Sequence, residues 1–172
     1  MKRNLTILTL AAAVMITSVA AVMAEDEGGK SKENPKEIEW IRYDDGLTRA
    51  KESDKHVFIN FTTSWCGFCK KMDKTTFADA EVIKMMHDYF VTVKVDGDSR
   101  DTLDIAGYKI TERNLTRSEF SVGSYPTYFF LASDGKKLGA IRGYQTKGQL
   151  MQYLTYVAEK KYDTTQTPKG GK

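Results

Sequence analysis

The chain contains two cysteines, Cys66 and Cys69, and two residues separate them. An apolar run at 57–61 precedes the pair, and residues of helical character follow from Gly67. A cysteine at the start of a helix lies where unpaired backbone N–H groups point outward, which favours the thiolate over the thiol. Because a thiolate is the species that attacks a disulfide, this placement predicts thiol–disulfide exchange. Cys66 is then the attacking thiol, and Cys69, one helical turn later, is the resolving thiol.

Other uses of the cysteine pair stay open at this point. Cys-x-x-Cys motifs also bind zinc, but a structural zinc site takes four ligands, and the only histidines are His56 and His87. We expect His56 to be a half-exposed packing residue and His87 to be solvated. A disulfide across so short a loop stabilises a fold little, which disfavours a purely structural crosslink. Two thiolates could hold a soft ion such as copper(I), although no Met-rich or His-rich tract accompanies them.

The pattern of apolar residues predicts the elements that position the pair. The run at 57–61 is almost continuously apolar, as in a strand that is covered on both faces. Asp79 and Thr146 are suited to begin helices, because their side chains can accept from the first free N–H groups. The expected strands are 57–61, 91–95, 127–131 and 137–142, and the expected helices are 38–53, 67–77, 79–90 and one that starts after Thr146.

Two stretches are harder to assign from the pattern. Asp45-Gly46 is expected to break the first helical stretch into a turn followed by a helix. In the interval 99–122, Leu103, Ile105 and Tyr108 are expected to pack a short helix, and 116–119 to start another.

The order of elements remains strand, helix, strand, followed by a hairpin, and this order implies a parallel crossover. The fold class is therefore α/β, with a mixed four- to five-stranded sheet and helices on both faces.

The beginning of the chain has the character of a secretory signal. Residues 1–24 combine a basic start, an apolar stretch and an Ala-containing cleavage site. An uncleaved membrane anchor is the alternative, and either one exports the remainder. We expect a flexible leader at 25–36, a folded domain at 37–160 and a disordered tail at 161–172.

Composition limits the function classes. The hydrophobic fraction of 41% and the charged fraction of 28% are those of a globular protein. The formal net charge of +3 includes Lys2 and Arg3 of the expected signal segment. The rest of the chain is nearly neutral, so nothing in its charge points to nucleic acid as a partner.

Several motifs together resemble the thioredoxin superfamily. They are 58–61 (Phe-Ile-Asn-Phe), 65–72 (Trp-Cys-Gly-Phe-Cys-Lys-Lys-Met), 125–127 (Tyr-Pro-Thr) and Gly143. Within the superfamily, the sequence is most similar to the exported group that includes the C-terminal domain of the transmembrane thiol:disulfide interchange reductase. The resemblance implies a thioredoxin fold with a cis proline at position 126 beside the thiols. It also implies client binding by residues around the cysteines and the proline, namely Trp65, Gly67, Phe68, Tyr125, Pro126 and Thr127.

The resemblance implies a function and partners as well. The expected function is that of a periplasmic dithiol reductant of disulfide-containing client proteins, with a membrane thiol–disulfide reductase as electron donor. A disulfide oxidant or isomerase, or a copper-binding module that uses the same cysteines, is the alternative. We expect a monomer, no metal, no nucleic acid, and no cofactor other than the redox-active Cys66–Cys69 disulfide.

Three features depart from the family pattern. Asn60 stands where many thioredoxins have a buried Asp that is a candidate proton acceptor for the resolving thiol, and Asn60 cannot ionise. Phe68 replaces the proline of general thioredoxins, so their reduction potential does not carry over. The interval from Asp96 to Pro126 is roughly a dozen residues longer than usual.

Overall fold

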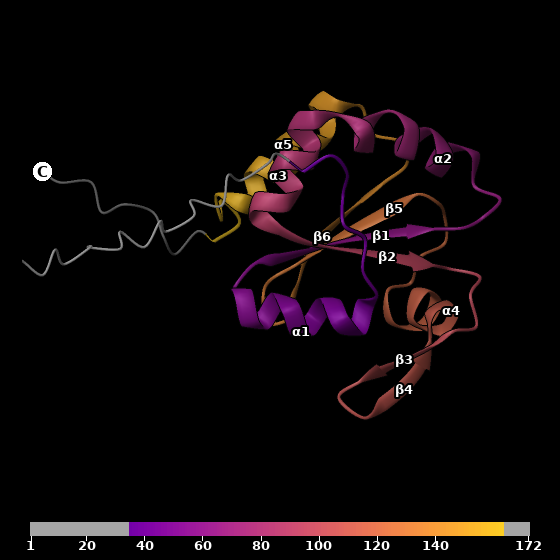
Figure 1. Cartoon of the computed structure of the whole chain (residues 1–172). Coiled ribbons are helices and arrows are strands. Elements are labelled where there is room, and N and C mark those ends of the chain that lie inside the picture. The colour runs from indigo at the N-terminus through magenta and orange to yellow at the C-terminus, as the bar shows by residue number, and fades with distance from the viewer. Residues whose placement is uncertain (1–34, 164–172) are drawn as a thin grey trace, which may run out of the picture. The chain divides into compact units, whose positions relative to one another are not determined.

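A four-stranded mixed sheet forms the centre of the computed structural model, which describes residues 35–163 (Figure 1). In spatial order the strands are β2 (Phe90–Asp96), β1 (His56–Thr62), β5 (Thr127–Leu131) and β6 (Lys137–Arg142). β1 pairs in parallel with β2, whereas β5 is antiparallel to both β1 and β6. The predicted strands and the mixed sheet are confirmed.

Helices cover both faces of this sheet, as predicted (Figure 1). One face carries α1 (Tyr43–Ser53), which packs against β1 and β2. The opposite face carries α2 (Gly67–Lys74), the short helix η1 (Thr76–Ala78), α3 (Ala80–Tyr89) and α5 (Lys147–Ala158). Two apolar clusters result, one on each side of the sheet.

Strand β1 divides its side chains between the two clusters. Val57, Ile59 and Phe61 point into the cluster beneath α1, and Phe58 points into the cluster beneath the other helices. All four are completely buried. Successive side chains of a strand alternate between the faces of a sheet, so a strand covered on both faces is apolar throughout. This burial fixes β1 in the middle of the sheet, directly before the cysteine pair.

The two predicted helix starts are confirmed. The Asp79 carboxylate accepts from the backbone N–H groups of Glu81 and Val82 at 2.9 and 3.4 Å. Thr146 and Gln149 form a reciprocal capping box at the start of α5. The helix predicted at 67–77 is divided instead, since α2 ends at Lys74 and η1 follows.

The predicted break at Asp45-Gly46 is wrong, because α1 runs through both residues. Gly46 is buried against β2, where a Cβ atom would lie 2.3 Å from the Cγ2 atom of Val93. The glycine therefore serves the close approach of helix and sheet rather than a turn.

The short helix predicted around Leu103 and Tyr108 is also wrong. This stretch is a hairpin of β3 (Thr102–Ile105) and β4 (Tyr108–Thr111), followed by α4 (Glu112–Asn114) and the helical turn η2 (Leu115–Glu119). Ala106 and Gly107 at the hairpin tip have φ angles of 53° and 90°. Two successive positive φ angles are typical of a turn whose twist matches that of the flanking strands. The helical start predicted at 116–119 falls within η2.

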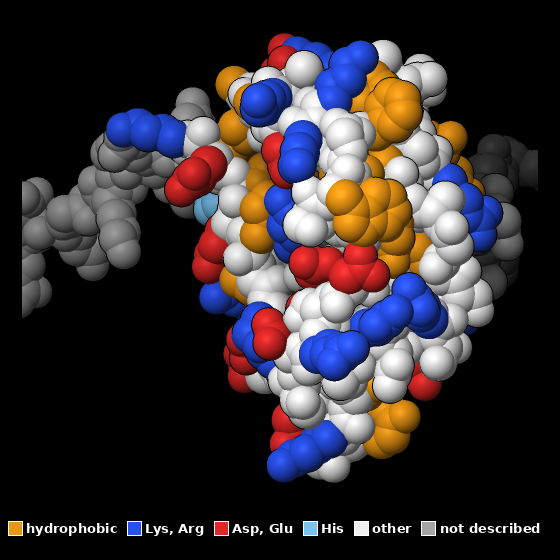
Figure 2. Space-filling view, turned by 90° about the vertical axis from the view of Figure 1, so that its right-hand side faces the viewer, with side chains coloured by type: hydrophobic (Ala, Val, Ile, Leu, Met, Phe, Trp, Pro, Cys, Tyr) orange, Lys and Arg blue, Asp and Glu red, His pale blue; other side chains and the backbone are white. Residues whose placement is uncertain are grey.

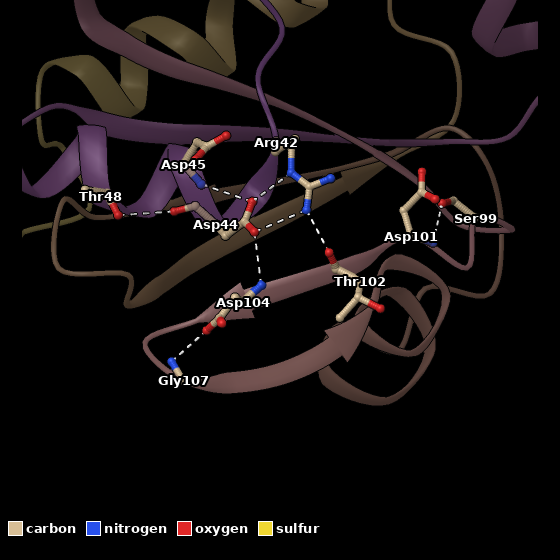
Figure 3. A network of polar contacts seen from close by, with 9 residues as sticks. All are labelled: Arg42, Asp44, Asp45, Thr48, Ser99, Asp101, Thr102, Asp104 and Gly107. Carbon is tan, nitrogen blue, oxygen red and sulfur yellow. Dashed lines mark hydrogen bonds and ion pairs between the residues drawn. The ribbon is translucent and has the colours of Figure 1, made fainter.

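Polar contacts attach this insertion, residues 99–122, to the first turn of α1 and to Arg42 directly before it (Figure 3). Arg42 Nη2 donates to the backbone oxygen of Thr102 at 2.8 Å, and Asp44 Oδ2 accepts from the backbone N–H of Asp104 at 3.0 Å. Arg42 and Asp44 also form an ion pair at 3.2 Å. The side chains of Arg42 and Asp44 thus bond backbone groups on the edge of β3 that does not pair with β4. These contacts hold the hairpin against the domain.

His56 is buried rather than half-exposed as expected, and a residue of the C-terminal segment covers it. Tyr162 Oη lies 2.6 Å from His56 Nε2, and the two rings pack edge to face. The described part of the expected tail, 161–163, thus contacts the domain. His87 is exposed, as expected.

The remaining parts of the expected tail, leader and signal segment, 164–172 and 1–34, lie outside the described residues. Within 35–163, no helix combines the length and apolar character that a membrane span requires.

Burial lowers the pKa of His56, and the positive charge of Lys160 adds to this, although Asp54 opposes it. In the unfolded chain this imidazole has a pKa of about 6.5 and begins to take up a proton near that pH. In the folded protein it stays neutral to a lower pH. We expect the free energy of unfolding to decrease as the pH falls through about 6.5 towards the lower folded-state pKa. Urea unfolding above and below this window measures the change.

The matched controls for this prediction are His56→Gln and His87→Gln. The pH dependence should disappear in His56→Gln and persist in His87→Gln, which alters an exposed imidazole. An unchanged pH dependence in His56→Gln would contradict the assignment.

Candidate functional site

The two cysteines lie at the junction of β1 and α2. Cys66 is the N-cap of α2, and its Sγ accepts the backbone N–H of Cys69 at 3.1 Å. Its own backbone N–H donates to the backbone oxygen of Thr63 at 3.2 Å, which completes the turn after β1. Cys66 and Cys69 are joined by a disulfide, with a Cα–Cα distance of 5.3 Å. The predicted placement of Cys66 at the start of a helix is confirmed, and a thiolate there receives an N–H donor as well as the helix dipole.

Exposed aromatic side chains border the nearly buried cysteines. Cys66 and Cys69 are 4% and 3% exposed, whereas Trp65 and Phe68 are 66% and 61% exposed. A Cβ atom built on Gly67 meets no other atom within 4 Å, so the backbone between the cysteines is open on one side. Figure 2 shows hydrophobic side chains gathered on this end of the molecule, with acidic and then basic side chains beneath them. Such a rim is suited to contact with another polypeptide.

The second predicted motif lies beside the first. The Tyr125–Pro126 peptide bond is cis, as the resemblance implied, and Thr127 begins β5. Thr127 is buried, and its hydroxyl donates to the backbone oxygen of Ser124 at 2.7 Å. The rings of Tyr125 and Trp65 pack edge to face at 5.8 Å. The structure therefore brings the motif at 125–127 into contact with the motif of the cysteine pair, through Tyr125 and Trp65.

Trp65 and Tyr125 form an aromatic wall next to the cysteine pair, and three residues that the sequence did not single out support this wall. Trp65 Nε1 donates to Asp98 Oδ2 at 2.6 Å, and Arg117 Nη2 lies 3.8 Å from Asp98 Oδ1. A Cβ atom on Gly97 would lie 1.9 Å from the phenol oxygen of Tyr125. In the sequence, 96–98 carries only the signal of a turn, which says nothing about the aromatic residues it supports. Arg117 links the insertion to the wall.

Gly97→Ala should disturb this wall without unfolding the protein. The added methyl group occupies the position of the Tyr125 phenol, and this flexible side chain must move away from Trp65. If the wall binds clients as the resemblance implies, KM for a protein disulfide should rise several-fold with a smaller change in kcat, because the substitution leaves the two sulfurs in place.

Steady-state reduction of a protein disulfide measures this prediction, with Gly139→Ala as the matched control. A methyl group at position 139 meets no atom within 4 Å and should leave both constants unchanged. Equal kinetics of the two variants would contradict a role for the wall in client binding.

A hollow of about 530 Å³ lies beside Cys69, which forms part of its lining. Lys94 also lines it and forms an ion pair with Asp73 at 3.1 Å. Asn60 is the strand neighbour of Lys94, and its buried Oδ1 has no hydrogen-bond partner among residues 35–163. The insertion contributes Glu112, which is 8% exposed. A buried carboxyl therefore reaches the region of the resolving cysteine from an element that sequence analysis did not connect with it.

No group of three or more His, Cys, Asp or Glu side chains within 35–163 is arranged to hold a metal ion. The described residues place the disulfide, the aromatic rim and the hollow at this end of the domain.

Comparison with protein families matches residues 43–158 to the model of a thioredoxin-like domain. Among curated proteins, the thiol:disulfide interchange protein DsbD of Campylobacter jejuni is 31% identical over 100 residues. The match covers 58% of this chain and 16% of the length of DsbD. A thioredoxin of Alicyclobacillus acidocaldarius is 28% identical over 118 residues, which are 67% of this chain and 94% of that protein.

Solved structures share the same fold. A thioredoxin-fold protein from Helicobacter pylori aligns with a TM-score of 0.60 and 20% identity, covering 67% of this chain and 76% of that one. A thioredoxin from Thermus thermophilus aligns with a TM-score of 0.60 and 22% identity, covering 72% and 89% of the two chains.

Proposed function

Because the chain belongs to the thioredoxin-like family and is a thiol–disulfide oxidoreductase, we propose that it acts as a dithiol reductant of disulfide-containing client proteins in the periplasm. The observation that carries this proposal is the position of Cys66 Sγ, which caps α2 and accepts the N–H of Cys69. The same N–H stabilises the thiolate that the reduced protein needs for attack.

The reaction consists of two exchanges. The Cys66 thiolate attacks one sulfur of a client disulfide, and a mixed disulfide forms while the other client sulfur leaves as a thiolate. Cys69 then loses its proton and attacks Cys66 Sγ. The Cys66–Cys69 disulfide forms, and the second client sulfur leaves. The client gains two electrons, which the protein dithiol supplies.

Client binding uses the two motifs that are in contact at this site, 65–69 and 125–127. An extended client segment would pair with the backbone of Tyr125, next to Pro126 and Thr127, in the manner of an added strand. Trp65 and Phe68 would cover the apolar side chains of the client, since both are exposed beside Cys66. Gly67 leaves room for the approach of the client sulfur.

The direction of electron flow is part of the proposal. The similarity to DsbD supports the reducing direction and a membrane thiol–disulfide reductase as the electron donor. The signal-like residues 1–24 support export. A disulfide oxidant would use the same two exchanges in reverse, and the reduction potential relative to the clients decides between the two.

Trapping of clients tests the proposal. Cys69→Ala removes the resolving thiol, so Cys66 should remain joined to its clients when the reduced variant meets a periplasmic extract. The double variant Cys66→Ala/Cys69→Ala is the matched control and should capture nothing. Recovery of reducible adducts with proteins that normally carry disulfides supports a reductant. Absence of any adduct, together with no reduction of insulin by the wild type, would refute it.

A further inference from the structure

The resolving step requires a proton acceptor that the Cys66 side of the site does not provide. Cys69 is only 3% exposed, so its thiol has little contact with bulk water. Asn60 is buried in β1, the strand that leads to the cysteine pair, and its amide does not ionise. Deprotonation of Cys69 must therefore use another group on the side that Cys69 does face.

That side is the hollow of about 530 Å³, which Cys69 lines together with residues of four other segments. A space of this size, with charged side chains in its lining, has room for many water molecules, each of which occupies about 30 Å³. Thr63 also lines the hollow, and its buried hydroxyl has no hydrogen-bond partner within the described domain. The hollow thus offers a hydrated path from Cys69 to any carboxyl that lines it.

Three carboxyl groups line the hollow, and two of them are already engaged. Asp73 forms an ion pair with Lys94, at 3.1 Å. Asp96 accepts the backbone N–H of Asp98 at 2.9 Å and thereby shapes the turn that supports Trp65.

Glu112 differs from these two groups. Burial raises the pKa of Glu112, and Asp101 and Asp96 add to this, against hydrogen bonds with the Ser99 side chain and the Asp96 backbone. The raised pKa of this carboxyl is closer to the pKa of a thiol than the pKa of an ordinary glutamate is. A proton passes more readily between groups whose pKa values are similar. The charged groups that face it from the surrounding elements are Arg42, Lys70, Asp73, Lys94, Asp96 and Asp101.

We propose that Glu112 exchanges a proton with Cys69 through the water of this hollow, so that the insertion supplies the carboxyl that position 60 lacks. Glu112 accepts the proton of Cys69 as this sulfur attacks Cys66 Sγ, and the Cys66–Cys69 bond forms while the client sulfur leaves as a thiolate. Glu112 later returns the proton to solvent, or to Cys69 when the disulfide is reduced. The inference rests on the dithiol chemistry of the proposed function.

Glu112→Gln tests this inference, because it keeps the shape and the hydrogen-bonding capacity of the side chain but cannot take up a proton. Glu119→Gln is the matched control, since it removes an exposed carboxyl of the same segment. The rate at which Cys69 resolves a mixed disulfide with a model peptide is measured in single turnovers from about pH 5 to about pH 9.

We expect Glu112→Gln to slow the resolving step roughly tenfold or more near neutral pH. The rate of the resolving step in Glu112→Gln should rise with hydroxide concentration. Its pH profile should lack the inflection that the profiles of the wild type and Glu119→Gln share. The initial attack by Cys66 should be unaffected. Superimposable pH profiles of the three proteins would overturn the inference.

A measurement on the wild-type protein covers the case in which Glu112→Gln does not fold. Carbon-13 NMR of the glutamate carboxyls gives the pKa of Glu112 in the disulfide and dithiol states. The two pKa values should differ, because the titration of Glu112 is coupled to that of Cys69. Identical values would overturn the inference even if the wild type reduces insulin, whereas failure of the wild type to reduce insulin would refute the proposed function.

Discussion

Replacing Cys66 with Ser is expected to abolish the reduction of protein disulfides, with a loss in turnover of roughly 10³-fold or more. A hydroxyl remains protonated at neutral pH even with the N–H of Cys69 directed at it, so no nucleophile is present. The disappearance of the disulfide of insulin, followed in the presence of a chemical reductant, measures the loss.

Cys69→Ser provides the contrast, because it loses turnover but keeps the first exchange. It should form one mixed disulfide per molecule with a peptide disulfide, and mass spectrometry should detect this adduct, whereas Cys66→Ser should form none. The reverse pattern would mean that Cys69 is the attacking thiol, against the geometry of the α2 N-terminus.

Of all the substitutions proposed, Phe58→Ala is expected to lower the free energy of unfolding the most. Phe58 is completely buried in β1, and its ring stacks on Tyr128 at 5.5 Å and meets Phe130 at 5.3 Å. Removing such a ring costs the transfer of the side chain and leaves a cavity, together about 3–5 kcal/mol. This is a large part of the total stability of a typical domain, about 5–15 kcal/mol.

Urea unfolding gives the measurement, with Phe68→Ala as the matched control. The same ring is removed in the control, but Phe68 is 61% exposed, so the expected change is within about 0.5 kcal/mol. Similar losses in the two variants would contradict the assignment of Phe58 to the core and of Phe68 to the surface rim.

The sequence predicted the parts of the fold that local chemistry determines. The apolar run of β1, the caps Asp79 and Thr146, and the cysteine spacing each act through neighbouring residues, and each prediction is confirmed. The cis bond before Pro126 came from the resemblance alone, because a proline before a strand is ordinary.

The errors occurred where a distant contact decides the structure. Gly46 suggested a turn, but it accommodates Val93, which lies 47 positions further along the chain. The hairpin of the insertion was missed because its tip is Ala106-Gly107, and alanine rarely has the positive φ that it has here. The alternation of Thr102 to Ile105 was the signal that could have identified β3.

In the candidate site, too, the sequence predicted the features that neighbouring residues determine and missed those that depend on distant contacts. The cysteines, the aromatic rim and the Tyr-Pro-Thr motif are visible as short motifs in the sequence. Asp98, Arg117 and Glu112 are not, because each is an ordinary charged residue until the fold brings it to Trp65 or to the hollow beside Cys69. Charged residues become recognisable as parts of a site through burial and geometry rather than through spacing.

The reactivity of Cys66 tests the central claim most directly. In the reduced protein, the pH dependence of alkylation by iodoacetamide is measured on Cys69→Ser, in which Cys66 is the only thiol, and compared with Cys66→Ser. Cys66 should react with a midpoint below the value of about 8.5 for a free thiol, and faster than Cys69 at neutral pH. A midpoint for Cys66 at or above about 8.5, or equal reactivity of the two sulfurs, would contradict the assignment of Cys66 as the ionised nucleophile at the start of α2.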